Sequence, residues 1–137
     1  MIINKNFQEN NLAIIGSRSF NNYAHAEQHI ADTIQKHNIS ITKIISGGAL
    51  GADKVAECFA HKHDIPIEVI KPNWSLGRQA GPVRNTEIIK KSDYIIAFWD
   101  GQSKGTLDSI NKAKKLNKKL FVFKITTKSI DEDVTPQ

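Results

Sequence analysis

The chain has little cysteine, no long apolar run and no signal-peptide pattern in residues 1–10, and each absence bears on the class of protein to expect. It holds one cysteine, Cys58, in 137 residues, so no internal disulfide can form. No apolar stretch reaches the roughly 20 residues of a membrane-spanning helix. Residues 1–10 lack the charged-then-apolar layout of a signal peptide, so we expect a cytoplasmic protein without a membrane partner. Cys58 lies on a helical pattern beside Val55 and Phe59 and is interpreted as a small buried side chain.

Several motifs of cofactor and metal proteins are missing as well. Gly47, Gly48 and Gly51 form Gly-Gly-x-x-Gly, which differs from the Gly-x-Gly-x-x-Gly of dinucleotide-binding folds. No Gly-Lys-Ser or Gly-Lys-Thr occurs, so a Walker A loop is excluded. His25 and His29 are four residues apart, but no third ligand accompanies them, and we predict no metal site. The sequence indicates no cofactor and no Ser-His-Asp or Cys-His catalytic group.

The composition is that of one ordinary globular domain. Hydrophobic residues make up 39% of the chain and charged residues 24%. The net charge of +5 favours anionic ligands in a general way. Much of the excess lies where a predicted helix ends, at Lys112, Lys114, Lys115, Lys118 and Lys119. We interpret these lysines as a solvated helix end that offsets the helix dipole, and we disfavour the alternative of a surface for nucleic acid.

Strand-like and helix-like patterns alternate along the chain. Apolar runs predict strands at residues 12–15, 42–46, 66–70, 93–99 and 120–125. Helical periodicity predicts helices at residues 23–37, 50–63, 82–91 and 104–117, with Leu107, Ile110 and Ala113 facing inward on the last, and a loop at 71–80. The predicted fold class is α/β: a single Rossmann-like domain over residues 11–125, with a mostly parallel five-stranded sheet and helices on both faces. Residues 1–10 are expected to be an N-terminal extension and residues 126–137 a polar C-terminal tail.

Three glycine-containing turns each follow a predicted strand. They are Gly16-Ser17-Arg18, the segment from Ser46 to Asp53, and the segment from Asp100 to Thr106. Carboxyl ends of parallel strands meet at one edge of a sheet, so the turns should converge there. Helix N-termini present free N–H groups to anions, and glycine lets an anion approach the backbone. The turns therefore predict a nucleotide or phosphosugar pocket.

Individual polar side chains near these turns have competing interpretations. Arg18 can bind a phosphate with its guanidinium fork, or form a salt bridge within the protein. Asp53 can accept a bond from a ribose hydroxyl or orient Arg18, or only offset a helix dipole. Asn85 can bond a base or ribose, or satisfy backbone groups, and the role of Arg78 is open.

The two tryptophans also have competing interpretations. Trp99 ends a predicted core strand, which favours packing over stacking on a base. Trp74 lies in the predicted loop beside Pro72, where an exposed ring is more suggestive of base stacking.

At the turns the chain resembles the SLOG superfamily, which includes DprA, the LOG cytokinin-activating enzymes and the nucleotide-sensing domains of TRPM channels. It is most similar to the small stand-alone YspA-type branch. The matching residues span positions 12–125 and include Gly81-Pro82 with Arg84-Asn85 besides the three turns. Arg84 matches an arginine that LOG enzymes use against substrate phosphate and sugar. The candidate ligand-binding residues are Gly16, Ser17, Arg18, Ser46, Gly47, Gly48, Ala49, Gly51, Asp53, Arg84, Asn85, Asp100, Gly101, Ser103, Gly105 and Thr106.

The last turn departs from the enzymes of the superfamily. LOG enzymes carry Pro-Gly-Gly-x-Gly-Thr-x-x-Glu, whose glutamate takes part in the glycosidic-bond chemistry. Here Gly105-Thr106 is present, but Ser109 stands at the glutamate position. Asp108 comes one residue early, about 100° away around a helix. The resemblance thus implies phosphate binding at this turn without the hydrolytic carboxylate.

Three function hypotheses follow from these observations. The first is binding of a nucleotide or nucleotide-derived ligand, such as a phosphosugar or ADP-ribose-like molecule, at the C-terminal edge of the sheet, as a sensor or carrier. The second is LOG-like hydrolysis of nucleoside 5′-monophosphates. The third is DprA-like binding of single-stranded DNA, which we rank lowest. Related folds often pair through helices, so a homo-oligomer is compatible with the sequence.

Overall fold

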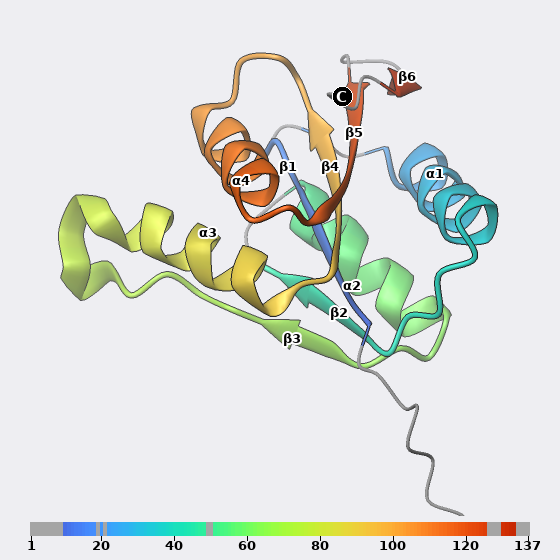
Figure 1. Ribbon diagram of the computed structural model, residues 1–137, viewed down its shortest axis with the longest axis horizontal. Helices are drawn as coiled ribbons and strands as arrows, with labels where there is room; N and C mark the ends of the chain where they lie inside the picture. The colour runs from blue at the N-terminus through green and yellow to red at the C-terminus, as the bar shows by residue number, and fades with distance from the viewer. Residues whose placement is uncertain (1–9, 19, 21, 49–50, 126–129, 134–137) are drawn as a thin grey trace, which may run out of the picture.

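The computed structural model describes residues 10–18, 20, 22–48, 51–125 and 130–133, and strands and helices alternate through them (Figure 1). In chain order the elements are β1 (Asn11–Gly16), α1 (Tyr23–Lys36), β2 (Lys43–Ser46), α2 (Ala52–Lys62), β3 (Ile67–Val69), the 3-10 helix η1 (Trp74–Gln79), α3 (Ala80–Lys91), β4 (Tyr94–Trp99), α4 (Lys104–Lys115), β5 (Lys119–Ile125) and β6 (Ile130–Asp133). None of the helices described here combines the length and the apolar character that crossing a bilayer needs.

The strands form one sheet in the order β3-β2-β1-β4-β5-β6 across the described part of the chain. The first five strands run parallel, as the sequence predicts, and Ala13 of β1 lies opposite both Ile45 and Ile95. The chain moves outward from β1 to β3 and then returns to β4 on the other side of β1. This reversal leaves a crevice beyond the carboxyl ends of β1 and β4, which is where open α/β sheets bind ligands.

Helices cover both faces of the sheet, and the strand residues alternate between two cores. Leu12 and Ile14 pack toward α1 and α2, whereas Ala13 and Ile15 pack toward α3 and α4 (Figure 1). Phe98 is fully buried on the first side, where its ring stacks on Phe20 with the ring centroids 5.2 Å apart. The α/β fold class predicted from the sequence is confirmed, because buried parallel strands must be covered on both faces.

Two of the side chains expected in the core are exposed instead. Cys58 is exposed, because the buried stripe of α2 runs through Val55, Ala56 and Phe59 and leaves position 58 on the solvent side. Leu107 is 37% exposed, since Thr106 and Ser109 occupy the inward face at the start of α4. The interpretation of Cys58 and the inward placement of Leu107 were therefore wrong. In both cases the prediction followed the apolar character of the side chain, whereas the position of the residue in the helical period places it on the solvent side.

Several boundaries also differ from the sequence pattern. Helix α2 begins at Ala52 because Gly51, its N-cap, has a φ of 76°, which a helical residue cannot adopt. Helix α3 begins two residues before Pro82, whose missing N–H is harmless anywhere in the first turn. The predicted loop at 71–80 contains η1, and strand β6 lies within the expected C-terminal tail, where it pairs antiparallel with β5.

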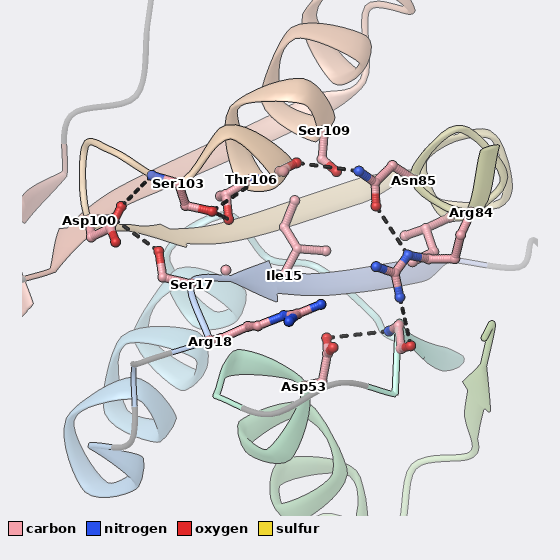
Figure 2. A pocket seen from close by; sticks show the side chains of 14 residues that line it. Ile15, Ser17, Arg18, Asp53, Arg84, Asn85, Asp100, Ser103, Thr106 and Ser109 are labelled. Atoms are coloured by element: carbon pink, nitrogen blue, oxygen red, sulfur yellow. Dashed lines mark hydrogen bonds between the residues drawn. The ribbon is translucent and has the colours of Figure 1, made fainter. Parts of the chain in front are cut away.

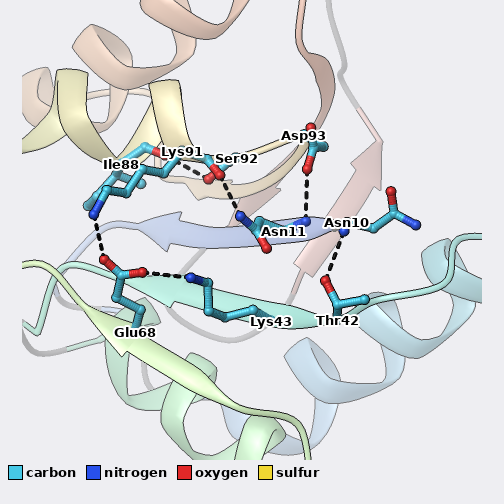
Figure 3. Close-up of polar contacts among 9 residues, drawn as sticks. All are labelled: Asn10, Asn11, Thr42, Lys43, Glu68, Ile88, Lys91, Ser92 and Asp93. Carbon is cyan, nitrogen blue, oxygen red and sulfur yellow. Dashed lines mark hydrogen bonds and ion pairs between the residues drawn. The ribbon is translucent and has the colours of Figure 1, made fainter. Parts of the chain in front are cut away.

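Polar contacts join the amino-terminal end of β1 and the edge strand β3 to α3 (Figure 3). The carboxylate of Glu68 in β3 accepts hydrogen bonds from Lys43 at 2.8 Å and from Lys91 at 2.7 Å. The hydrogen bond from Lys43 is the largest cause that lowers the pKa of Glu68, and the bond from Lys91 adds to it. On β1, the Asn11 side chain donates to the carbonyl of Lys91 at 2.8 Å. These contacts fix α3, which carries Arg84 and Asn85, against the sheet.

Candidate ligand-binding site

A cavity of about 480 Å³ lies beyond the carboxyl ends of β1, β2 and β4, at the reversal of strand order (Figure 2). Its lining comes from all three glycine-containing turns and from α3. The residues are Ile15, Gly16, Ser17, Arg18, Gly47, Asp53, Arg84, Asn85, Ile88, Asp100, Ser103, Gly105, Thr106 and Ser109. The turns therefore converge on one cavity, as parallel strands require.

Most of the candidate ligand-binding residues line this cavity, and a few do not. Those outside the lining are Ser46, Gly48, Gly51 and Gly101, while Ala49 lies outside the described residues. Ser46 is buried and its hydroxyl accepts a bond from the Gly48 N–H at 3.2 Å, so it shapes the turn. The lining also contains Ile15, Ile88 and Ser109, which were not candidates. Of these three residues, only Ser109 could have been predicted from the sequence, because it follows the candidate Thr106 by nearly one helical turn.

Gly47 connects two charged side chains of the cavity. Its carbonyl accepts a bond from Arg84 Nη1 at 2.8 Å, and its N–H donates to Asp53 Oδ1 at 3.3 Å. A Cβ at this position would lie 2.6 Å from Arg84 Nη1. Arg84 can thus keep this position only if residue 47 is glycine, because the guanidinium group occupies the space beside the backbone.

Arg18 and Arg84 point toward one another across the cavity (Figure 2). Burial lowers the pKa of Arg84, Asp53 opposes this change, and the positive charge of Arg18 lowers the pKa further. Within the described residues, the guanidinium of Arg18 forms no ion pair, so the salt-bridge interpretation finds no partner there. The site therefore places the partly buried guanidinium of Arg84 near the exposed side chain of Arg18, with Asp53 as a counter-charge, and a bound anion would interact favourably with both arginines.

A chain of hydrogen bonds between α3 and α4 holds Arg84 in place. Arg84 Nε donates to Asn85 Oδ1 at 3.1 Å, and Asn85 Nδ2 donates to Asp108 Oδ2 at 3.1 Å. Lys112 donates to the same carboxylate oxygen at 2.8 Å. Asp108 is absent from the cavity lining, as its displacement around the helix predicts. Its carboxylate orients the Asn85 amide and, through it, the guanidinium.

The turn before α4 is filled by its own side chains. Asp100 Oδ1 accepts bonds from the backbone N–H groups of Gln102, at 2.8 Å, and Ser103, at 2.7 Å. The Ser103 hydroxyl accepts from the Thr106 N–H at 3.4 Å and caps the helix. The bond from the Ser103 N–H is the largest cause that lowers the pKa of Asp100, against an opposing effect of burial. A carboxylate therefore already occupies N–H donors that the glycine-turn pattern predicts for phosphate.

The two tryptophans lie outside the cavity lining. Trp99 packs against the core beneath α3 and α4, and its Nε1 donates to the Ser103 carbonyl at 3.0 Å, which agrees with the packing interpretation. Trp74 is 70% exposed on η1. An exposed ring was expected there, but its position does not place it over a ligand in the cavity.

Comparison with known proteins finds a family that about half of the chain resembles. Residues 11–77 match the model of the YAcAr family, described as the YspA, cpYpsA-related SLOG family. No curated protein matches the sequence.

Solved structures share the fold at low identity. DNA processing protein A (DprA) from Streptococcus pneumoniae is 18% identical, with a TM-score of 0.66 over 83% of this chain and 50% of that one. DprA from Helicobacter pylori, studied for its single-stranded DNA binding, is 24% identical, with a TM-score of 0.63 over 89% of this chain and 68% of that one. The structural-genomics target TM1055 is 14% identical, with a TM-score of 0.57 over 82% of this chain and 72% of that one. The chain spans about half the length of the pneumococcal structure. Over residues 11–77 the chain is therefore similar to the YspA-related SLOG family, and it shares the fold of DprA and TM1055.

Proposed function

We propose that this protein binds a phosphorylated nucleotide or nucleotide-derived ligand in the cavity, as a sensor or carrier. The observation that carries the proposal is the pair of guanidinium groups, Arg18 and Arg84, that face one another inside the cavity. A phosphate between them would accept hydrogen bonds from both planar forks and offset their mutual repulsion. Arg84 is already oriented by Gly47 and Asn85, so little ordering is needed on binding.

The rest of the cavity suits the uncharged part of such a ligand. Ile15 and Ile88 supply an apolar wall, and the hydroxyl-bearing residues Ser103, Thr106 and Ser109 lie on the α4 side. Ligand sites commonly combine an apolar wall with a few polar groups that fix orientation. A sugar or base could therefore lie along α4 while the phosphate stays at the arginines.

A thermal-shift panel tests whether the phosphate is required. Mono-, di- and cyclic nucleotides and ADP-ribose should raise the melting temperature, whereas unphosphorylated nucleosides should raise it far less. A ligand that binds only the native state at a hundredfold excess over its Kd adds about 2.7 kcal/mol of stability. The absence of a response to every phosphorylated ligand would overturn the proposal.

Calorimetry on Arg84→Ala tests the residue assignment. The variant should lose roughly tenfold to over a hundredfold in affinity, because one charge-assisted bond contributes about 1.5–3 kcal/mol. Arg78→Ala is the matched control, since Arg78 is an exposed arginine on η1 outside the cavity lining. Equal affinities in the two variants would mean that Arg84 has only a structural role.

Hydrolysis of a nucleoside monophosphate is the second candidate, favoured by two carboxylates, Asp53 and Asp100, that line the cavity. Ser109 lines it too, at the position where the LOG enzymes carry glutamate. We expect little release of free base from AMP, GMP, CMP or UMP. If slow turnover occurs, Ser109→Glu should raise kcat without tightening binding, because the new group would act only in the transition state. Robust turnover that is lost in Asp53→Asn or Asp100→Asn would establish an enzyme.

Single-stranded DNA binding remains the lowest-ranked function. The Helicobacter pylori DprA is described as binding single-stranded DNA, and it shares the fold of this chain. Part of the lysine cluster is engaged within the protein, since Lys112 donates to the Pro82 carbonyl and to Asp108. We expect weak binding that fades with salt. Submicromolar affinity at physiological salt, measured by fluorescence anisotropy, would reverse this ranking.

A further inference from the structure

We propose that Asp100 is a specificity-determining residue whose carboxylate excludes a second phosphate from the α4 end of the cavity. The inference rests on the proposed function, in which one phosphate lies between Arg18 and Arg84. It adds that the ligand presents uncharged hydroxyl groups, and no further phosphate, toward α4. Ligands whose phosphate groups all lie at the arginines would then be accepted, whereas bisphosphates with a separate phosphate on the sugar would be rejected.

The position of the Asp100 carboxylate is fixed by the backbone around it. Two N–H groups, of Gln102 and Ser103, donate to Oδ1, and the N–H of Asp100 itself donates to the Ser17 hydroxyl at 3.3 Å. Figure 2 shows Asp100 beside Ser17 and Ser103 at the cavity. A carboxylate that accepts two backbone N–H bonds, on a residue whose own N–H is also bonded, cannot turn away to admit an anion without breaking the two bonds to Oδ1.

The carboxylate that lines this end of the cavity is ionised. The hydrogen bond from Ser103 keeps the pKa of Asp100 below its usual value, so the group stays ionised at neutral pH. Two lysines lie nearby, since Lys104 begins α4 and the side chain of Lys124 approaches Gly101, but neither lines the cavity. Asp53, the other carboxylate of the lining, is electrostatically coupled to Arg84.

The groups around Asp100 suit sugar hydroxyls better than phosphate. A carboxylate accepts hydrogen bonds from hydroxyl groups but repels a phosphate dianion. The donors that a phosphate would need at this helix start are partly used, because Ser103 and Thr106 N–H groups bond to side chains of the turn itself. The remaining hydroxyls of Ser103 and Thr106, 3.1 Å apart, can both donate and accept.

The test compares adenosine 5′-monophosphate with adenosine 2′,5′-bisphosphate and 3′,5′-bisphosphate by calorimetry. Asp100→Asn removes the charge but keeps an oxygen that can accept hydrogen bonds from the N–H groups of Gln102 and Ser103, so the turn is preserved. Asp32→Asn removes a charge from the exposed side of α1 and serves as the control. Because two charges in a partly buried site interact strongly, Asp100→Asn should shift the preference toward a bisphosphate by at least about tenfold. The wild type and Asp32→Asn should both prefer the monophosphate.

The outcomes separate this inference from the proposed function. If the wild type binds the monophosphate and Asp100→Asn leaves the preference unchanged, the inference is wrong and the proposed function stands. If the wild type binds both bisphosphates as tightly as the monophosphate, the inference is likewise wrong. If no phosphorylated adenosine binds any variant, the proposed function fails and the inference falls with it.

Discussion

Replacing Gly47 by alanine should abolish most of the ligand affinity without unfolding the protein. The new Cβ would lie 2.6 Å from Arg84 Nη1 and 3.2 Å from Arg84 Cζ, well inside normal contact distances. The Arg84 guanidinium must therefore move. Because it is the far end of a flexible side chain, it can do so while the backbone stays in place.

The magnitude follows from the contacts that are lost. In the folded protein, Arg84 gives up its bond to the Gly47 carbonyl, while alanine reduces the conformational entropy of the unfolded chain. The free energy of unfolding should fall by only about 1–2 kcal/mol. Displacement of the guanidinium from the phosphate costs about 1.5–3 kcal/mol, which is roughly tenfold to over a hundredfold in affinity.

Calorimetry with adenosine 5′-monophosphate and urea unfolding measure the two effects separately. Gly81→Ala is the control, since a Cβ there meets nothing within 4 Å, and the change should leave affinity unchanged. The double variant Gly47→Ala with Arg84→Ala should bind no more weakly than Arg84→Ala alone, because both remove the same interaction. Additive losses, or a Gly47→Ala protein with unchanged affinity, would refute the reasoning.

Three further changes test the fold. Gly51→Ala should cost more than about 3 kcal/mol in urea unfolding, because its φ is 76° and a Cβ would lie 2.3 Å from a backbone oxygen, and a loss below 1 kcal/mol would contradict this. Phe98→Ala should lower the free energy of unfolding by about 3–5 kcal/mol, as expected for a fully buried ring. A smaller loss would mean that the surrounding side chains fill the space that the ring leaves. The lowered pKa of Glu68 means that its ion pairs contribute stability above about pH 4.5. This contribution is lost as the pH falls through the lower pKa that Glu68 has in the folded protein. Between pH 6 and pH 3 the stability of Glu68→Gln should therefore fall less than that of the wild type, and parallel curves would show that these ion pairs are negligible.

The sheet was predictable because its signals are local. Unbroken apolar runs such as residues 12–15 and 94–99 are typical of strands buried on both faces, and β1 and β4 are found there. Strand β6 was missed because Ile130–Asp133 is mostly acidic and has little strand propensity. Its pairing with β5 depends on contacts that no local pattern records.

The location of the site was predictable, but its internal contacts were not. Parallel strands force their following turns together, which is why Gly16, Gly47 and Gly105 line one cavity. The bonds from Arg84 to Asn85 and on to Asp108 cross between two helices, and their geometry depends on how those helices pack. The occupation of the α4 turn by Asp100 likewise depends on side-chain conformation, so the turn could be mistaken for a free phosphate site.

A crystal structure of the protein with adenosine 5′-monophosphate tests the central claim most directly. The phosphate should lie between the guanidinium groups of Arg18 and Arg84, with the ribose hydroxyls toward Asp100. A phosphate seated instead on the backbone N–H groups at the start of α4, or a ligand outside the cavity, would contradict the account.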